Sequence, residues 1–509
     1  MSEPPSTVFS HGFRQFSVSG RPFPIFGGTV GDSTASDPAL LESKVWPAAR
    51  ALHLNTVFAP VSWQLLEPEE GKFDFSVPDA IFRGARENGL KLAVIWYGAW
   101  KNGTSCYAPD WVKLDWDRFP LARPLLGRRT ELLSPCSPEM LGAEKAAFSA
   151  LMRHLKKMEE AEGGAEPTVI MVQIEEGIGM VGGSRDASGD SDSRWSAGVP
   201  DALISGLKAR AGRLHPEIAK ALGRVGSWPE VFGPNAEGAF MAWQFAKHVE
   251  TLANAGSLEL PVPYFVSAWS LATSSARNTG EKPGGAPDGE MADVWDIAAP
   301  AVLRALPSPT AQSLLFLHPS AGEDSTPALF PRVDPQPDFA AKLMVLFGGA
   351  LASGVSIAGI ESFSDNGGES LAARAIGAMS ALSAKLGDIR AESTVRGLMQ
   401  QARGSSTVSL GDYSFTLEWT RPARGLETPG GCFAAIGGDG AFWIAGLGAK
   451  LVPRHDRAGY VTSILSQEEF LLRDGSLVRG RILNGTDRDI LLPEGEISIR
   501  RFRLYRRPI

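Results

Sequence analysis

Short apolar runs that alternate with longer amphipathic stretches constrain the fold of this 509-residue chain more than any other feature. Repeated strand–helix units imply parallel strands. About eight such units in roughly the first 375 residues predict an α/β fold of the (β/α)8 TIM barrel type, with long loops. An open doubly wound sheet is the alternative, weakened because no GxGxxG follows the first strand. The predicted strands are Phe23–Gly28, Asn55–Pro60, Leu90–Tyr97, Thr168–Ile174, Pro263–Ala268, Leu314–His318, Ala328–Pro331 and Val355–Ile360, and the predicted helices are Ser36–Leu52, Val77–Asn88, Ala143–Glu160, Ala236–Ala255, Pro337–Ala352 and Ser370–Lys385.

The pattern changes from about Gly387 onward. Short, often alternating apolar runs are separated there by turns rich in Gly, Asp and Pro, which is typical of an antiparallel β-sandwich or jelly roll. We therefore expect a barrel domain at 1–386 and a C-terminal antiparallel β-sandwich at 387–509. Two polar, Gly-rich segments, Gly182–Ser196 and Asn278–Glu290, are expected to be loops.

Charge and cysteine content limit the possible partners and cofactors. The 50 Lys and Arg residues against 57 Asp and Glu residues give a net charge of −7, which argues against a nucleic-acid partner. Cys106, Cys136 and Cys432 lack metal-ligand or disulfide spacing and are expected to be free thiols. No apolar run is long enough for a membrane span, and the first residues do not resemble a secretory signal. The expectation is a cytoplasmic protein without a membrane or nucleic-acid partner, metal or organic cofactor; the sequence does not predict its oligomeric state.

Polar and aromatic residues that follow the predicted strands are the candidates for a binding site, because a barrel carries its reacting groups at the carboxyl ends of its strands. Aromatic faces stack on sugar rings or on planar apolar ligands. The alternative is that several of these rings belong to the core. The substrate-binding candidates are the aromatic residues Trp63, Trp96, Tyr97, Trp100 and Trp269, with Lys101 as an anion anchor and Asp32 after the first strand.

Glu175 and Glu176 are the clearest acidic feature of the chain. Neighbouring residues at a strand end point in opposite directions, so one of the two is expected to face the barrel axis while the other pairs with a nearby loop. A carboxylate in a partly apolar pocket can act as a general acid, although a structural ion pair is the alternative. Glu361, at the end of a later strand, is a second carboxylate candidate, and His318 and Arg332 lie near the later strands.

Several segments resemble the glycoside hydrolase family 35 β-galactosidases, in their bacterial and fungal branch with a C-terminal β-domain. The first is Asn55-Thr-Val-Phe-Ala-Pro-Val-Ser-Trp63 followed by Glu67-Pro-Glu-Glu-Gly-Lys-Phe-Asp-Phe75. Trp96-Tyr-Gly-Ala-Trp-Lys-Asn-Gly103, Tyr107-Ala-Pro-Asp-Trp-Val-Lys113 and Gly359-Ile-Glu-Ser362 extend the match. The resemblance implies a clan-A barrel followed by a β-sandwich. It also implies retaining hydrolysis by two glutamates about 5–5.5 Å apart.

The chain departs from that family at the positions that carry the chemistry. The family's Val-Glu-Asn-Glu-x-x-Gly pattern aligns with Ile174-Glu-Glu-Gly-Ile-Gly179, which puts Gly177 in place of the acid/base glutamate. The Phe-x-Pro-Glu pattern of the nucleophile aligns with Leu329-Phe-Pro-Arg332, which puts Arg332 in place of the nucleophile. Losing either glutamate removes several kcal/mol of transition-state stabilisation.

Three functions remain open on the sequence. The first is a repurposed enzyme that performs acid/base chemistry on a small polar or sugar-like substrate by cyclisation, isomerisation, elimination or dehydration. There Glu175 or Glu176, with Glu361 or His318, moves protons and Arg332 binds a carboxylate or a developing oxyanion. The second is an active β-galactosidase-like hydrolase with displaced carboxylates. The third is a non-catalytic barrel that binds a carbohydrate or a partner.

Overall fold

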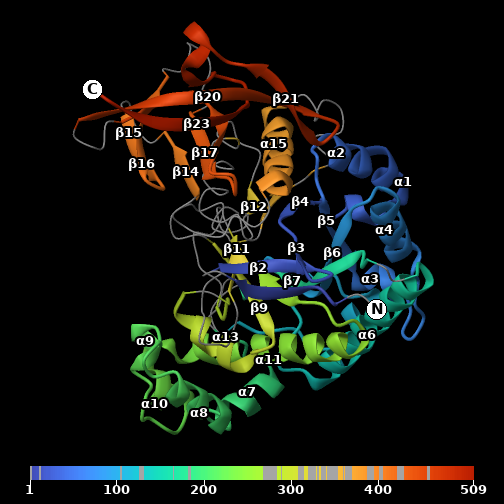
Figure 1. Cartoon of the computed structure of the whole chain (residues 1–509). Helices are drawn as coiled ribbons and strands as arrows, with labels where there is room; N and C mark the ends of the chain where they lie inside the picture. Colours follow the sequence, from blue (N-terminus) through green and yellow to red (C-terminus); the bar gives the residue numbers. More distant parts are fainter. Residues whose placement is uncertain are drawn as a thin grey trace.

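Two β-rich parts joined by a long helix make up the molecule (Figure 1). The computed structural model describes residues 3–10, 13–103, 106–124, 131–163, 166–180, 185–267, 284–287, 289–307, 315–318, 328–329, 332–333, 340, 354–358, 360, 370–386, 395–400, 405–420, 429–454 and 459–509.

A curved parallel sheet forms the first part. Its strands are β4 (Ile25–Thr29), β5 (Thr56–Ser62), β6 (Lys91–Lys101), β7 (Val169–Glu176), β8 (Tyr264–Ser267), β9 (Val302–Pro307), β12 (Arg332–Val333) and β13 (Gly354–Ala358). They pair in parallel in the order β9-β8-β7-β6-β5-β4-β13-β12, and β10 (Leu315–His318) and β11 (Ala328–Leu329) extend the sheet antiparallel from β9. A β9–β12 pairing, which would close the sheet, is not among the pairs formed by the described residues. The predicted (β/α)8 barrel is thus seen as a partial, TIM-like barrel.

Helices cover the outer face of this sheet, as the strand–helix alternation predicts. α4 (Ser76–Glu87) contacts β5 and β6, α6 (Pro138–Ala161) contacts β6, and α11 (Ala236–Glu259) contacts β7 and β9. The single helix expected at Ser36–Leu52 is divided into η1 (Thr34–Ser36), α1 (Pro38–Leu40), a π-helical turn η2 (Leu41–Val45) and α2 (Trp46–Ala51). The shorter helices are α3 (Trp63–Leu66), α5 (Asp110–Lys113) and α13 (Ala292–Ala298). The helix predicted at Pro337–Ala352 falls almost wholly outside the described residues.

A helical insertion follows β7, where the sequence predicts a loop. Gly182–Ser196 contains α7 (Gly189–Ser196), so that prediction is wrong for the second half of the segment. The insertion continues through α8 (Asp201–Ala209), α9 (Pro216–Ala219), α10 (Trp228–Phe232) and η3 (Gly233–Asn235). The ring of Phe240 at its base meets those of Trp195 and Trp228 edge-on, which anchors α7 and α10 to α11. Most of the predicted loop Asn278–Glu290 lies outside the described residues, and η4 (Gly289–Met291) begins at its end.

A small N-terminal sheet, which the sequence analysis does not predict, packs into the concave side of the parallel sheet. It consists of β1 (Ser6–Ser10), β2 (Phe13–Val18) and β3 (Arg21–Pro22). Phe16 and Val18 are buried there in one cluster with Ile25, Phe58 and Phe265. Where the side chains are described, the interior of the partial barrel is therefore filled at this sheet.

Two antiparallel sheets form the second part of the molecule. The larger has the order β14 (Val395–Met399), β17 (Gly431–Ile436), β18 (Phe442–Leu447), β23 (Ser498–Pro508), β20 (Tyr460–Arg473), β21 (Ser476–Ile482). The smaller has the order β15 (Ser405–Leu410), β16 (Tyr413–Trp419), β19 (Ala449–Pro453), β22 (Ile490–Leu492), and a short turn η8 (Gly485–Arg488) precedes β22. Apolar residues of both sheets share one core, as in a sandwich. The division at 386/387 stays a prediction.

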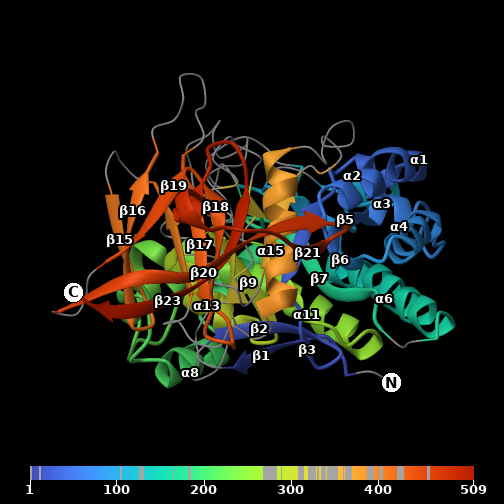
Figure 2. The same cartoon turned by 45° about the horizontal axis from the view of Figure 1, so that its top comes forward.

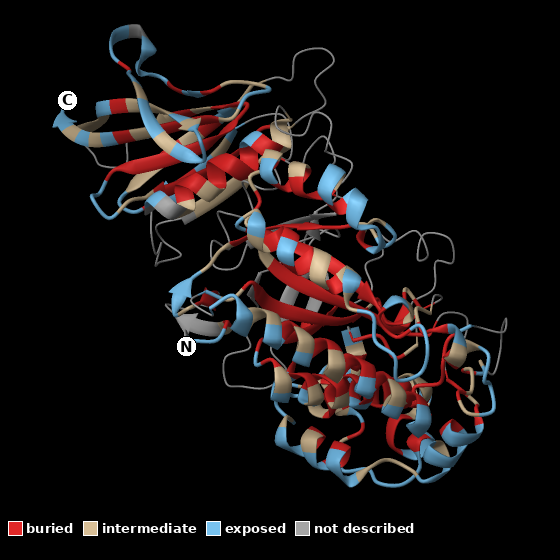
Figure 3. Ribbon diagram, turned by 90° about the vertical axis from the view of Figure 1, so that its right-hand side faces the viewer, coloured by how far each residue is buried: buried red, intermediate tan, exposed pale blue. Residues whose placement is uncertain are grey.

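Helix α15 (Leu371–Leu386) joins the two parts (Figure 2). The six-stranded sheet uses both faces, because Cys432 and Ala434 enter the sandwich core whereas Phe433 and Ala435 enter the cluster that contains α15. That cluster continues into the parallel sheet, and buried residues run from one part into the other (Figure 3). The two parts are therefore bound by a shared apolar core.

Cys106, Cys136 and Cys432 are free thiols, and burial raises the pKa of each to about 12. Within the described part of the chain, no helix has the length and apolar character needed to cross a membrane.

Two helical glycines give a matched test of the junction at α15. A Cβ on Gly377 would lie 2.5 Å from Leu472 Cδ2 and 2.8 Å from His53 Cδ2, whereas a Cβ on Gly142 in α6 would meet nothing within 4 Å. We expect Gly142→Ala to stabilise the protein by about 0.5–1 kcal/mol, because alanine favours helix. We expect Gly377→Ala to destabilise it by about 1–2 kcal/mol, because overpacking outweighs that gain. Thermal unfolding of both variants checks this, and equal shifts would contradict the tight junction.

Candidate active site

A cluster of polar side chains lies where β4, β6 and β7 end. Asp32 follows β4, Tyr97 and Lys101 belong to the last residues of β6, and Glu176 is the last residue of β7. β4, β5, β6 and β7 are parallel neighbours, so their carboxyl ends share one edge of the sheet. This is the edge at which barrel proteins carry their reacting groups.

Tyr97 is the centre of this cluster. Its hydroxyl oxygen lies 2.6 Å from Glu176 Oε2 and 2.9 Å from Asp32 Oδ1, and accepts a hydrogen bond from Lys101 Nζ at 3.0 Å. A phenol has one proton, so Tyr97 donates to one carboxylate at a time. The two carboxylate oxygens contact the same hydroxyl and so lie within about 5.5 Å of one another.

Lys101 is the cation of the cluster. Its ammonium group forms an ion pair with Asp32 and lies 3.7 Å from Glu176 Oε2. It also lies 4.3 Å from the centre of the Tyr97 ring and 5.9 Å from that of Tyr107. Lys101 and Glu176 expose only 6% and 13% of their side chains, whereas Asp32 exposes 43%, so the cluster opens to solvent at Asp32. Partial burial strengthens these charge interactions relative to a surface pair.

Tyr107 completes the cluster from the loop after β6. Its ring centre lies 5.0 Å from that of Tyr97. Burial raises the pKa of the Tyr107 hydroxyl, and the negative charges of Asp32 and Glu176 add to that rise. Tyr107 is therefore a proton donor within reach of the same carboxylates.

Glu175 faces away from this cluster, so the two neighbouring glutamates point in opposite directions. It is fully buried, with φ at +59°, and its carboxyl accepts hydrogen bonds from Gly98 N at 3.1 Å and Ala99 N at 2.6 Å. These contacts tie the end of β7 to the end of β6. Glu175 thus supports the strand that carries Tyr97 and Lys101.

A second buried carboxyl, Glu144 of α6, lies beside Glu175. Glu144 accepts a hydrogen bond from Trp96 Nε1 at 2.9 Å and lies 2.7 Å from His248 Nε2. Burial is the main reason that the pKa of Glu175 is held well above its usual range. The charge of the neighbouring Glu144, and the hydrogen bond between the two carboxyls, raise that pKa further. The two carboxyls fit beside Gly98 because this residue has no side chain. A Cβ there would lie 2.2 Å from Glu144 Oε1 and 2.9 Å from Glu175 Oε1.

The structure corrects the prediction that Trp63, Trp96 and Trp100 line a binding site. Trp63, Trp96 and Trp100 are all 0% exposed. Trp63 donates to Glu67 Oε2 at 2.8 Å, Trp96 packs edge-on to Phe148 of α6, and Trp100 packs edge-on to Phe245 of α11. Trp96 and Trp100 occupy even positions of β6 and face the helices, whereas Tyr97 and Lys101 occupy odd positions and face the site. The three tryptophan rings have no face open to a ligand.

The side chains of four predicted site residues lie outside the described part of the chain. Trp269 and Glu361 lie outside the described residues. His318 is the last residue of β10 and Arg332 the first of β12, but their side chains are outside the described part. Their roles stay predictions.

Sequence reasoning missed Tyr107, Glu144 and His248. Glu144 does carry a signal, because it lies four residues after Met140 and four before Phe148 on the apolar face of α6. A carboxyl in the middle of such a face requires a buried partner. No group of three or more His, Cys, Asp or Glu side chains in the described ranges is arranged to hold a metal ion.

Position 177, where the resemblance places the acid/base glutamate, has no room for a side chain. Gly177 has a φ of +61°. A Cβ there would lie 2.9 Å from Asn102 Oδ1 and 3.2 Å from Asn102 Cα. The neighbouring residue, Glu176, supplies the carboxylate at this edge of the sheet.

The chain is distantly similar to a glycoside hydrolase of the β-galactosidase type. A β-galactosidase from Xanthomonas manihotis is 26% identical over 194 residues, which cover 37% of this chain and 30% of that protein. The chain thus matches less than a third of the relative's length. Residues 375–491 match a family model described as a domain of unknown function, DUF5597, which runs from α15 into the C-terminal sheets.

Solved structures give weaker matches. An exo-β-1,4-mannosidase from Opitutaceae bacterium strain TAV5 is 15% identical, with 53% of this chain and 36% of that chain covered and a TM-score of 0.31. The catalytic domain of a β-amylase from Paenibacillus polymyxa is 13% identical, with 67% and 94% covered and a TM-score of 0.41. Scores this low carry no argument about fold or function.

Glu175 makes the stability of the protein depend on pH. Its pKa is raised in the folded state, so above about pH 4.3 the folded protein keeps a proton that the unfolded chain releases. This contribution therefore lowers stability as pH rises, by up to about 1.4 kcal/mol per pH unit. We expect Glu175→Gln to gain stability relative to the wild type between pH 5 and 8.

Calorimetric unfolding of both proteins across that range measures the difference. Glu87→Gln, which removes an exposed carboxylate from α4, is the matched control. A difference between Glu175→Gln and the wild type that stays constant with pH would contradict the buried acid.

Proposed function

We propose that this chain is a glycoside-hydrolase-like enzyme that binds a sugar-like small molecule at the carboxyl end of its parallel sheet and transfers protons on it. In this proposal the sheet closes into a (β/α)8 barrel, and the reaction is an isomerisation, elimination, dehydration or cyclisation. The observation that carries the proposal is the position of Lys101 beside both Asp32 and Glu176.

The surroundings of Glu176 suit a base better than an acid. A retaining glycosidase needs one carboxyl that begins the reaction protonated, so that it can protonate the leaving group. Glu176 receives a 2.6 Å contact from the Tyr97 hydroxyl and lies 3.7 Å from the Lys101 ammonium. Both favour the ionised carboxylate. An ionised carboxylate accepts a proton from the substrate, and Tyr97 or Tyr107 returns one.

The remaining predicted residues have assigned roles in this proposal. Arg332 binds a carboxylate or a developing oxyanion of the substrate, because a guanidinium donates in a bidentate manner and cannot act as a nucleophile. Glu361 and His318 are further proton carriers, and Trp269 packs on the apolar face of the ligand.

One observation favours a second function, which is hydrolysis of a β-galactoside with displaced carboxylates. Asp32 and Glu176 lie within about 5.5 Å of one another, close to the separation typical of a retaining pair. The position of Lys101 argues against this second function. In a retaining site the negative charge of one carboxylate keeps the other carboxyl protonated, and the Lys101 ammonium neutralises that charge.

The test uses two assays on the same protein. In the first, the wild type is incubated with tagatose or galacturonate in D2O, and nuclear magnetic resonance follows deuterium uptake at the carbon next to the carbonyl or carboxylate. We expect uptake, and we expect Glu176→Gln to slow it by at least 100-fold, because a general base contributes about 10²–10⁴. Glu87→Gln is the matched control and should retain the wild-type rate.

The second assay is release of nitrophenol from p-nitrophenyl β-galactoside between pH 4 and 8. We expect no release above background. Release that is lost in Glu176→Gln would overturn the proposal in favour of the hydrolase. Absence of both deuterium uptake and release would overturn it in favour of a non-catalytic protein.

Replacing Gly177 gives a further prediction. We expect Gly177→Glu to create no β-galactosidase activity, because its backbone φ of +61° and the contact with Asn102 prevent the new side chain from occupying this position without displacing the loop. We also expect a loss of about 1–3 kcal/mol in stability. Thermal unfolding and the nitrophenol assay check both. A stable variant that releases nitrophenol would show that the position can still carry the acid.

A further inference from the structure

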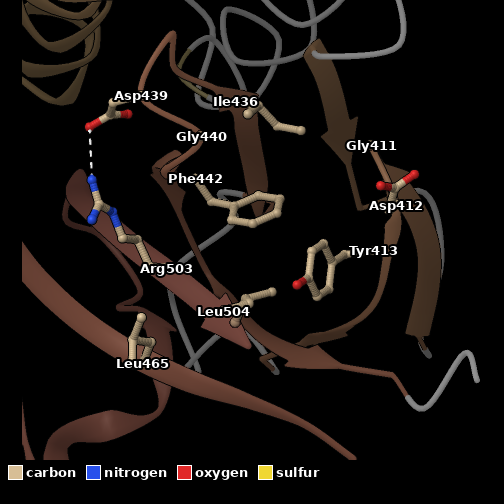
Figure 4. A pocket seen from close by; sticks show the side chains of 10 residues that line it. All are labelled: Gly411, Asp412, Tyr413, Ile436, Asp439, Gly440, Phe442, Leu465, Arg503 and Leu504. Atoms are coloured by element: carbon tan, nitrogen blue, oxygen red, sulfur yellow. Dashed lines mark ion pairs between the residues drawn. The ribbon is translucent and has the colours of Figure 1, made fainter. Parts of the chain in front are cut away.

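A pocket of about 440 Å³ lies at one end of the C-terminal sandwich (Figure 4). Its wall comes from the turn between β15 and β16, the turn between β17 and β18, and strands β20 and β23. Its volume falls in the range of about 300–1,000 Å³ that is usual for small-molecule sites. The residues of the candidate active site do not contribute to it.

The backbone is shaped to leave this space open. Gly411 has a φ of +56°, and a Cβ there would lie 2.7 Å from Ile436 Cδ1. Gly440 has a φ of +74° in the opposite turn. The pairing of β20 with β23 shifts between Ile464 and Ser466, which leaves Leu465 as a bulged residue on the pocket wall. Bulges of this kind redirect a side chain next to functional sites.

The floor of the pocket is aromatic and apolar. The rings of Tyr413 and Phe442 meet edge-on, with centres 5.5 Å apart, and Leu504 lies beside them. The guanidinium of Arg506 lies 4.6 Å from the centre of the Tyr413 ring, which supports that ring from another strand. Phe442 is only 4% exposed and stacks on Phe502 with ring centres 5.3 Å apart, so Tyr413 is the ring of the floor that is available to the C–H face of a sugar.

The rim of the pocket carries one acceptor and one donor that the fold does not use up. Asp439 is engaged by Arg501 and accepts from Ala441 N at 3.1 Å, and Arg503 reaches it only at 3.6 Å. Arg503 therefore keeps donors for a ligand, and its side chain is 47% exposed. On the opposite side of the pocket, the carboxylate of Asp412 has no hydrogen-bond partner in the described part of the chain. Arg506 donates a hydrogen bond to the backbone carbonyl of Asp412 and not to its carboxylate.

We propose that this pocket is a second binding site, for one unit of a neutral saccharide. The carboxylate of Asp412 and the half-exposed guanidinium of Arg503, which pairs with Asp439 at 3.6 Å, lie across an apolar floor and favour a ligand without net charge whose groups both donate and accept. Hydroxyl groups do both, and a sugar ring places them around an apolar face. An anion would be repelled by Asp412, and a cation by Arg503. The site would hold a carbohydrate independently of the reaction at the parallel sheet.

The experiment is titration calorimetry of the full chain with lactose and with β-1,4-galactobiose. We expect saturable binding, and we expect Arg503→Ala and Asp412→Ala each to weaken it at least five-fold. Arg507→Ala is the matched control, because Arg507 is exposed on the same strand and outside the pocket. It should bind like the wild type.

The outcomes separate this site from the proposed function. Binding that is unchanged in Arg503→Ala and Asp412→Ala but lost in Glu176→Gln would place the sugar at the parallel sheet alone and overturn the second site. Absence of saturable binding of either disaccharide at 20 mM would overturn it as well. A third outcome is that the two pocket variants lose binding while the wild type takes up no deuterium. That result would support the second site and overturn the proposed reaction.

Discussion

The hydrogen bonds from Gly98 and Ala99 to the buried carboxyl of Glu175 hold the candidate site together. They fix the end of β6 against the end of β7, and β6 carries both Tyr97 and Lys101. Without them, the last residues of β6 would lack partners for two buried backbone N–H groups, which is costly in an apolar interior. The positions of the phenol and the ammonium that organise the cluster therefore depend on a carboxyl that faces away from it. The cost of this arrangement falls on Glu175, because burial and the neighbouring Glu144 disfavour a charge on it.

Much of this architecture could be predicted from the sequence, because it follows from periodicity. The runs around Thr56–Ser62 and Val169–Glu176 are apolar on both faces, as strands of a covered parallel sheet require, and their flanking helices are amphipathic. The opposite directions of Glu175 and Glu176 depend instead on the left-handed backbone of Glu175, with φ at +59°, which the sequence pattern does not contain. The clustering of Asp32, Tyr97, Lys101 and Glu176 follows from the rule that parallel strands end together.

The failures have equally local causes. Position at a strand end predicts that Trp96 and Trp100 bind substrate, but both occupy even positions of β6 and therefore point to the helices. Gly and Ser content suggested a loop at Gly182–Ser196, yet the packing of Trp195 against Phe240 stabilises helix α7. Tertiary contact thus outweighed local propensity. The partnership of Glu144 with Glu175 joins residues of different elements, and single-sequence periodicity contains no information about such a pairing.

Similarity to a β-galactosidase indicates where a site should lie, but side chains decide what it can do there. Two carboxyls in a retaining site differ in protonation because their mutual repulsion keeps a proton on one of them. Asp32 and Glu176 lie within about 5.5 Å of one another, and Lys101 forms ion pairs with both. The two carboxylates therefore share one cation and one phenol. In the proposed reaction this site accepts a proton from carbon or oxygen rather than donating one to a leaving group, and the position of Lys101 is the observation on which that proposal depends.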